Sequence, residues 1–469
     1  MVYFSELDEL FRESNPYLSV LELEPETFWQ KIYRGETAEG ASYVPNIEAM
    51  ARISELPQHK LVHSVGFPIG GSFCDCGNHV ALLAEAVNKL GASWASEHLS
   101  FNAIQNGGAI EQVGFLLPPR QTCAGARTAT SNIRRLAGQL PVPFAFETGV
   151  NYLQPRAEEL PDGEFFASIA EAADCGIVLD LHNLWVNERN GREPVANVID
   201  ALPLDRVWEV HLAGGMMLDG YYLDSHSAAI PEPLIEIAAQ VIPRLPNLGA
   251  LIFEILPAYM PQVGLDAVRA QLSRLNALWQ LRPAHRVSVP RRPNVVAQLP
   301  QGSDDVIEWE RVLGTLAVGH TQLNCDDYGL KRDGGVAVLR TLIDEARDAR
   351  ISRALRFTTI LLLLHLGPSS VHNLLADYRI NSFPDMFTSG EADRFASYLH
   401  GRLEMLSPIP FLASVLAFEH ALVRATLYGT SSRIEWDVDP TELFAALDAG
   451  QIPSPSRTTR FIMDVVAEG

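Results

Sequence analysis

Short apolar runs alternate with longer segments of helical periodicity through the first half of the chain. Runs of β-branched and aromatic residues predict strands, and apolar residues recurring every third or fourth position predict amphipathic helices. The predicted strands are residues 19–24, 60–67, 94–101, 143–149, 175–183, 207–215 and 250–256. Because these runs are almost continuously apolar, both faces of the sheet are expected to be buried, which is typical of parallel strands.

The order of the elements favours one α/β architecture. Helical patterns follow the strands, for example at residues 79–91, 130–140 and 164–176. Seven or eight such units predict a (β/α)8 barrel of the TIM type, although no eighth strand is identifiable in the sequence. A doubly wound parallel sheet is the alternative arrangement.

Metal-competent side chains stand at the carboxyl ends of these predicted strands. They are His63, His98, Glu147, Asp180, His211 and Glu254, with Asp224 and His226 in the loop after the sixth strand. A single histidine or carboxylate at such a position is usually structural. In a barrel, however, all strand ends meet at one mouth, and gathering four imidazoles and four carboxylates without a cation would be costly. The set therefore predicts a metal site.

The ligand types narrow the choice of metal. Imidazole and carboxylate without thiolate suit iron, manganese or zinc, and eight ligands are too many for one tetrahedral ion. Two or three ions are therefore expected, and ligand type does not separate iron from zinc.

Composition excludes several classes of function. The net charge of −21 and the pI of about 5.0 argue against a large phosphate-binding surface and hence against nucleic acid. The odd count of five cysteines and an N-terminus without signal-peptide features predict a cytoplasmic protein. The most apolar run, residues 360–364, is too short to cross a membrane.

The ordered motifs of residues 15–280 carry a resemblance to a known family. They are LELEPETFW (21–29), HSVGFPIGG (63–71), SEHLSF (96–101), FLLPPRQT (115–122), FETGVNY (146–152), LDLHNLWVN (179–187), EVHLAGG (209–215), LDSHSAAIPEP (223–233) and FEIL (253–256). In this order the segment resembles the multinuclear non-heme iron-dependent oxidative enzymes, the family of the iron oxidase of methanobactin biosynthesis.

The resemblance implies a site and a reaction. The implied metal ligands are His63, His98, Glu147, Asp180, Asn183, His211, Asp224, His226 and Glu254. They would hold two or three iron ions of mixed valence, with O2 as co-substrate. The implied substrate is a ribosomally made precursor peptide, modified most often at cysteine. A homo-oligomer or a small accessory protein is also compatible with the resemblance.

Two positions depart from the family pattern. Glu147-Thr148-Gly149 stands where the family commonly has Glu-Asn-Pro, which alters a turn and not a ligand. His182-Asn183 stands where Asn-Asn is common and leaves open whether His182 joins the site. If residues 175–183 form one strand, its alternation points these two side chains to opposite sides.

Three alternative functions remain open from the sequence. Endonuclease IV uses a similar ordered pattern to hold three zinc ions for phosphodiester hydrolysis, but Asn183 stands where that pattern has histidine. Barrels of the xylose isomerase type would need a catalytic lysine at a strand end, and none is found. The chain could also bind metal or peptide without turnover.

The second half of the chain has a different pattern. The predicted division is a barrel over residues 1–281, a Pro- and Arg-rich linker over 282–303 and a mainly helical domain over 304–469. The segments 395–399 and 418–425 loosely resemble the partner proteins that recruit peptides in this family, so we expect a fused recruitment domain. Cys74 and Cys76 in a predicted loop, and four scattered C-terminal histidines, are not assigned to the site.

Overall fold

A parallel sheet forms the centre of the N-terminal half. The computed structural model describes residues 1–13, 15–33, 41–73, 77–284, 305–320 and 328–467. Adjacent strands pair in chain order and all in parallel: β1 (Val20–Leu23), β4 (His59–Ser64), β5 (Ala95–His98), β8 (Phe144–Glu147), β9 (Gly176–Asp180), β10 (Val207–Ala213) and β13 (Ala250–Glu254). Each predicted apolar run therefore contains one strand of this sheet.

The sheet curls into a barrel. Glu22 on β1 reaches across the interior to His211 on β10, with 3.3 Å between Oε1 and Nε2. The segment at Val2 forms a parallel bridge with Glu22 and packs against Ala250 and Ile252 of β13, between the two edge strands. This segment takes the place of an eighth strand, and its single bridge explains why the sequence did not reveal it. The predicted TIM-type barrel is confirmed.

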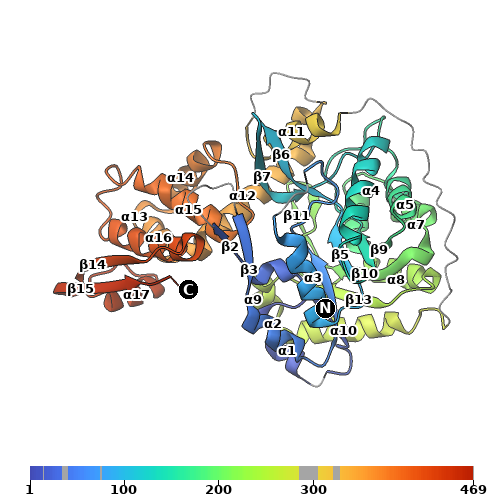
Figure 1. The fold of residues 1–469 in the computed structure, drawn as a ribbon, viewed down its shortest axis with the longest axis horizontal. Coiled ribbons are helices and arrows are strands. Elements are labelled where there is room, and N and C mark those ends of the chain that lie inside the picture. The colour runs from blue at the N-terminus through green and yellow to red at the C-terminus, as the bar shows by residue number, and fades with distance from the viewer. Residues whose placement is uncertain (14, 34–40, 74–76, 285–304, 321–327, 468–469) are drawn as a thin grey trace.

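Helices cover the outside of the barrel (Figure 1). They are α1 (Asp8–Arg12), α2 (Ile47–Ser54), α3 (His79–Leu90), α4 (Cys123–Ala137), α5 (Asp162–Ala173), α6 (Leu181–Arg189), α7 (Val195–Ala201), α8 (Glu232–Val241), α9 (Met260–Val263) and α10 (Leu265–Trp279). α4 begins seven residues before the predicted start, because Thr122 caps it by accepting a hydrogen bond from the Gly125 amide.

Three antiparallel hairpins, which the sequence pattern did not predict, extend the loops at the carboxyl ends of the strands. They are β2 (Trp29–Tyr33) with β3 (Ala41–Pro45), β6 (Phe101–Asn106) with β7 (Ala109–Leu117), and β11 (Met216–Leu218) with β12 (Tyr221–Leu223). These hairpins therefore build up the rim of the barrel mouth.

The hydrophobic cores divide the chain at a different place from the predicted boundary. α11 (Val306–Ala317) packs on the β6–β7 hairpin, and Trp309 lies in the barrel's core. α12 (Gly334–Ala354) spans both units, since Ile343 belongs to the barrel's core and Ile351 to the next one. Most of the predicted linker, residues 285–304, lies outside the described residues.

The remaining elements form a second, mainly helical unit beside the barrel (Figure 1). They are α13 (Arg356–Leu366), α14 (Pro368–Ile380), α15 (Thr388–His400), α16 (Leu412–Tyr428), β14 (Ser432–Val438), α17 (Pro440–Asp448) and β15 (Arg457–Val465). The segment 432–439, interpreted as a strand, contains β14, which pairs antiparallel with β15. Across the described residues, no helix combines the length and apolarity needed to cross a membrane.

Candidate metal centre

Strand register brings the polar strand ends to one level. Parallel pairing sets His98 beside Glu147 on β5 and β8, and Asp180 beside His211 on β9 and β10. Glu254 pairs two residues beyond His211, on the same face of the sheet. The side chains at the carboxyl ends of neighbouring strands thus face one interior, as expected for a barrel mouth.

A first group of donors surrounds one oxygen of Glu147. Its Oε2 lies 3.0 Å from Nε2 of His63 and 3.0 Å from Nε2 of His98. The other ring nitrogen of His63 lies 2.8 Å from the Ser96 hydroxyl, which sets the ring orientation. Two imidazoles and a carboxylate with one donor atom each within 4.8 Å of the others form a set that could hold one ion.

A second group uses the other oxygen of Glu147. This Oε1 lies 3.8 Å from Nδ1 of His211, and these two residues form a compact triad with Asp180. Asn183 donates from its amide nitrogen to the same Oε1 at 3.2 Å, while its own Oδ1 is buried without a partner. Glu147 therefore belongs to both groups and would serve both of them if each held an ion.

A third group lies nearer the surface. Oδ1 of Asp224 lies 2.8 Å from Nε2 of His226 and 2.9 Å from Nδ1 of His182. Glu254 connects this group to the second one, because its Oε2 faces His226 at 3.4 Å and its Oε1 faces His211 at 3.4 Å. The structure therefore places His182, which the sequence had left open, beside the predicted ligands.

The geometry at His182 differs from the predicted strand alternation. β9 ends at Asp180, whose carboxylate caps α6 by accepting from the Asn183 amide at 2.8 Å. His182 and Asn183 are thus the second and third residues of a helix and point to Asp224 and Glu147, respectively. They diverge because of helical rotation and not because of the two-residue period of a strand.

Two buried carboxylates beneath His211 were missed as site residues. Oε1 of Glu22 lies 3.3 Å and Oε1 of Glu209 lies 3.7 Å from Nε2 of His211, while Trp94 donates to Glu209 at 2.9 Å. Burial and the neighbouring Glu209 raise the pKa of Glu22 to about 8. Each of these two glutamates stands inside an otherwise apolar strand. This sequence pattern indicates a polar partner in the barrel interior.

The donor set fits cations. Buried donor atoms without a hydrogen bond include Nε2 of His63, Oε2 of Glu147, Oδ2 of Asp180, both ring nitrogens of His211, Nε2 of His226 and Oε2 of Glu254. Burial and the neighbouring Glu147 raise the pKa of Asp180 well above its usual range. Buried polar atoms that face one another without bonding are costly unless a charge of opposite sign lies between them. The structure brings the nine predicted ligands together with His182, and their role as ligands stays a prediction.

The centre opens to solvent on one side. The His98, Asp224 and His226 side chains are 24%, 16% and 22% exposed, whereas those of Asp180 and His211 are fully buried. His226 adopts a left-handed backbone with φ of 45°, an unusual conformation for a residue other than glycine. A substrate would therefore approach the first and third groups, and the second group lies at the bottom.

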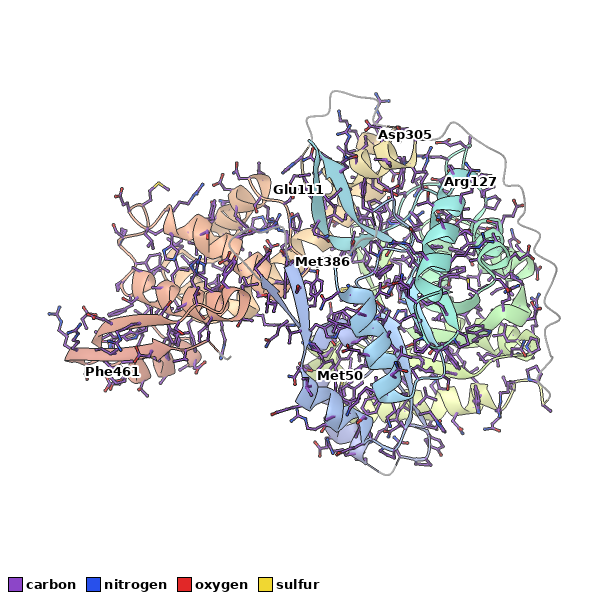
Figure 2. All side chains as sticks on the ribbon, in the orientation of Figure 1. Met50, Glu111, Arg127, Asp305, Met386 and Phe461 are labelled. Carbon is purple, nitrogen blue, oxygen red and sulfur yellow. The ribbon has the colours of Figure 1, made fainter. Side chains whose placement is uncertain are left out.

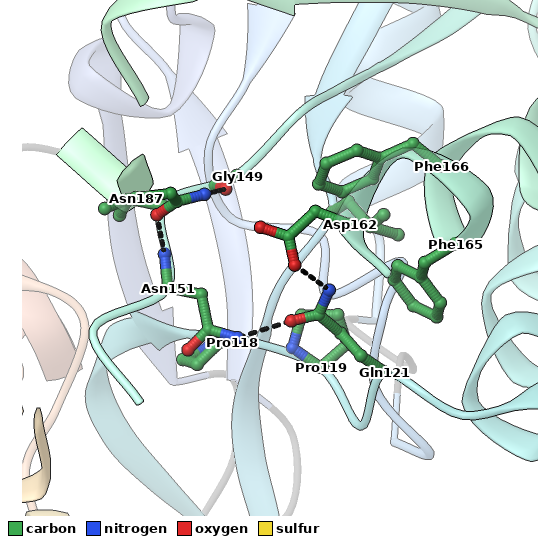
Figure 3. Close-up of a pocket in the computed structure, with 11 residues that line it drawn as sticks. Pro118, Pro119, Gln121, Gly149, Asn151, Asp162, Phe165, Phe166 and Asn187 are labelled. Carbon is green, nitrogen blue, oxygen red and sulfur yellow. Dashed lines mark hydrogen bonds between the residues drawn. The ribbon is translucent and has the colours of Figure 1, made fainter. Parts of the chain in front are cut away.

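A buried network holds the turn after Glu147 (Figure 3). Asn187 donates to the Gly149 carbonyl at 3.2 Å and accepts from the Asn151 amide at 2.7 Å, and Asn151 donates to Gln121, which donates to Asp162. The enclosed space of about 10 Å³ is too small for a substrate. The difference from the family pattern at residues 147–149 thus lies in a turn that this hydrogen-bond network stabilises.

Other residues singled out in the sequence lie apart from these groups. His400 and His420 lie 3.1 Å apart on α15 and α16, and His420 bonds Asp393 at 2.8 Å. Their sequence spacing concealed this contact because they belong to different helices. Cys74 and Cys76 lie outside the described residues.

Removing the charge of Glu209 tests whether the carboxylates beside His211 support metal binding. We expect Glu209→Gln to weaken metal binding by roughly 10–100-fold, because the charge 3.7 Å from Nε2 of His211 is lost while all nine predicted ligands remain. Titration with ferrous iron against a chelator measures the affinity, and Glu85→Gln on the exposed surface of α3 is the matched control. Equal affinities for the two variants would contradict this role.

The fold and the buried donors together define a class: a βα-barrel with a candidate multinuclear metal centre at its mouth. The family model of the RiPP precursor modification enzymes MbnB/TglH/ChrH matches residues 11–259. The chain belongs to this family, which is described by the modification of RiPP precursors. The resemblance drawn from the motifs is confirmed.

Two related proteins carry the description UPF0276 protein. One from Anaeromyxobacter sp. (strain Fw109-5) is 31% identical over 234 residues, which cover 50% of this chain and 80% of the relative. One from Streptomyces avermitilis is 29% identical over 241 residues, which cover 47% of this chain and 49% of the relative. This chain thus spans about half of the Streptomyces protein.

Solved structures show weaker likeness. D-psicose 3-epimerase from Clostridium cellulolyticum aligns with a TM-score of 0.38 at 11% identity, covering 60% of this chain and 95% of that one. Endonuclease IV from Thermus thermophilus aligns with a TM-score of 0.37 at 16% identity, covering 60% and 97%.

Proposed function

We propose that this protein is an O2-dependent oxidase that uses two or three iron ions to modify a precursor peptide, most often at a cysteine. The observation that carries the proposal is the single buried cluster of imidazoles and carboxylates, bridged by Glu147 and Glu254, in a chain of a peptide-modifying family. Iron would supply redox chemistry with O2, which accepts the electrons that the peptide loses.

The role of each residue would depend on how deeply it lies below the barrel mouth. Asp180, His211 and Glu147 lie at the bottom, where burial excludes water and Glu22 and Glu209 orient His211. His98 and His226 flank the open side, where a cysteine side chain can approach without displacing the deeper ligands. This separation leaves the buried ligands in place while the substrate binds and leaves.

The metal distinguishes this proposal from a hydrolase. Protein produced with iron and kept anaerobic should carry roughly two to three irons per chain, since the ligand groups share bridging carboxylates. Elemental analysis and Mössbauer spectroscopy measure the number and valence of the ions. Stoichiometric zinc, with activity that needs neither iron nor O2, would replace the oxidase proposal with hydrolysis of the endonuclease IV type.

A short reading frame with cysteines next to this gene would be the candidate precursor, and its peptide tests which residue reacts. We expect mass spectrometry to show an oxidative mass change only when iron, reductant and air are all present. A peptide with serine in place of each cysteine should remain unmodified. Modification of that serine peptide at another residue would retain the oxidase but reject cysteine as its target.

A further inference from the structure

A large groove separates the barrel from the C-terminal helices. It encloses about 830 Å³ and is bounded by the β2–β3 and β6–β7 hairpins on one side and by α12, α15 and α16 on the other. Met386, which lines it, lies where the two units meet (Figure 2). Val65 and Gly66, the residues directly after β4, also line it, so the groove reaches the strand that carries His63.

One face of α12 forms a wall of this groove. Its lining residues are Ala346, Ala349, Arg350, Arg353 and Ala354, which recur at helical spacing. The alanines leave space along this face, while the two arginines lie one turn apart on it. Trp29, Tyr43, Phe115 and Phe387 supply aromatic surface around the same space.

The carboxylates nearest the two arginines form ion pairs with other cations. Lys31 pairs with Asp385 at 2.7 Å and Arg347 with Glu391 at 2.8 Å, so the nearby acids are already engaged. Within the described residues, neither Arg350 nor Arg353 makes an ion pair.

Arg350 is anchored on one side only. Its Nη2 donates to the Gly114 carbonyl of β7 at 2.9 Å, whereas its Nη1 is buried without a hydrogen bond. An arginine that is held in place and left with unused donors is ready to receive a carboxylate, because a charge-assisted bond would compensate its burial.

The first turn of α15 borders the same space. Thr388 and Ser389 of its first turn line the groove, and no side chain caps this N-terminus. The carboxylate of Asp385 already lies at this helix end, where its Oδ1 accepts from the Phe387 amide at 2.9 Å. The positive charge that faces the groove without an ion pair is therefore that of Arg350 and Arg353, in a chain whose net charge is −21.

We propose that this groove binds an acidic segment of the precursor peptide, whose carboxylates pair with Arg350 and Arg353 while its apolar side chains contact the aromatic wall. The inference rests on the proposed function in that the ligand is the substrate peptide. It also gives the second unit a role: binding in the groove raises the concentration of the reacting residue at the barrel mouth.

A random peptide library tests the chemistry without knowledge of the natural substrate. Sixteen-residue peptides displayed on their mRNA are selected on the full-length protein without added iron. We expect Asp and Glu to be enriched beside apolar residues, and the selected peptides to bind Arg350→Gln/Arg353→Gln at least about tenfold more weakly. The double variant Arg356→Gln/Arg433→Gln, which removes two arginines outside the groove, is the matched control.

Reversing the charge of Arg353 distinguishes a loss of peptide recognition from a loss of folding. Arg353 is exposed, and Arg353→Glu should keep the melting temperature while shifting the selected peptides toward Lys and Arg. Selected peptides without charge preference, equal binding by the glutamine variant and its control, or no binding peptides at all would each overturn the proposal.

Cross-linking locates the bound peptide. Leu422 lines the groove and is 46% exposed, so a photoreactive phenylalanine analogue there should capture a selected acidic peptide, and the same analogue at exposed Met405 should not. Capture at Met405 alone would place the site elsewhere. Because neither measurement uses iron, failure of the oxidase proposal leaves the binding result intact, and failure of the groove leaves the iron result intact.

Discussion

Glu147→Gln is expected to remove at least one metal ion per chain and to lower activity by at least about 100-fold. The substitution keeps the volume of the side chain but removes the charge that its two oxygens share between His63 and His98 on one side and His211 on the other. A bridging carboxylate contributes to two ions at once, so its loss should exceed the roughly 10–100-fold cost of changing a residue that only orients a ligand.

Iron content by elemental analysis and turnover of the precursor peptide measure this effect together. Glu48→Gln, on the exposed side of α2, is the matched control and should leave both unchanged. A Glu147→Gln protein with full iron content and full turnover would show that this carboxylate does not bridge metal ions.

Glu391→Ala should destabilise the C-terminal unit by about 3–5 kcal/mol, because it leaves a buried guanidinium without its partner. Arg347 and Glu391 are both fully buried and lie 2.8 Å apart. Glu391 also accepts from the Tyr378 hydroxyl at 2.9 Å and from the Asp385 amide at 2.7 Å, so it joins α12, α14 and the segment before α15.

Hydrogen exchange of the α15 amides measures this local free energy, with the amides of α4 in the barrel as an internal reference. Asp464→Ala breaks an exposed pair with Arg433 and should cost less than about 1 kcal/mol. Equal protection of α15 in the two variants would mean that the buried pair adds nothing to the unit's stability. Glu391 accepts from the Asp385 amide, and Asp385 pairs with Lys31 in the lining of the groove. We therefore also expect Glu391→Ala to disturb this lining and to weaken the binding of acidic peptides.

The same buried centre explains why the family motifs are spread over so much of the chain. The predicted ligands come from several strand ends, from the start of α6 and from the loop after β12, and the barrel is needed to bring them together. The groove is lined by Val65 and Gly66, which follow β4, and by Asn102, which follows β5, whereas Asp224 and His226 follow the β11–β12 hairpin. A peptide held in the groove would therefore approach the centre past His98.

Local pattern determined the barrel strands and the predicted ligands. An apolar run that is buried on both faces has few ways to fold, and a polar residue at its end lies at the mouth of whatever barrel forms. For this reason, the sequence could predict that His63, His98, Glu147, Asp180, His211 and Glu254 meet at one mouth, while their role as ligands stays a prediction. The gathering of several carboxylates and imidazoles at one mouth, and not any single residue, indicated a cation.

Only the tertiary structure decided the features that depend on contacts between distant segments. His182 joins the third group because an Asp180 cap turns residues 181–189 into a helix, and Glu22 meets His211 because the sheet closes. α11 belongs with the barrel because Trp309 packs into its core, although no local pattern distinguishes it from the later helices. Strand and helix periods report burial, but the identity of the neighbour that buries a residue is set by chain closure and long-range packing.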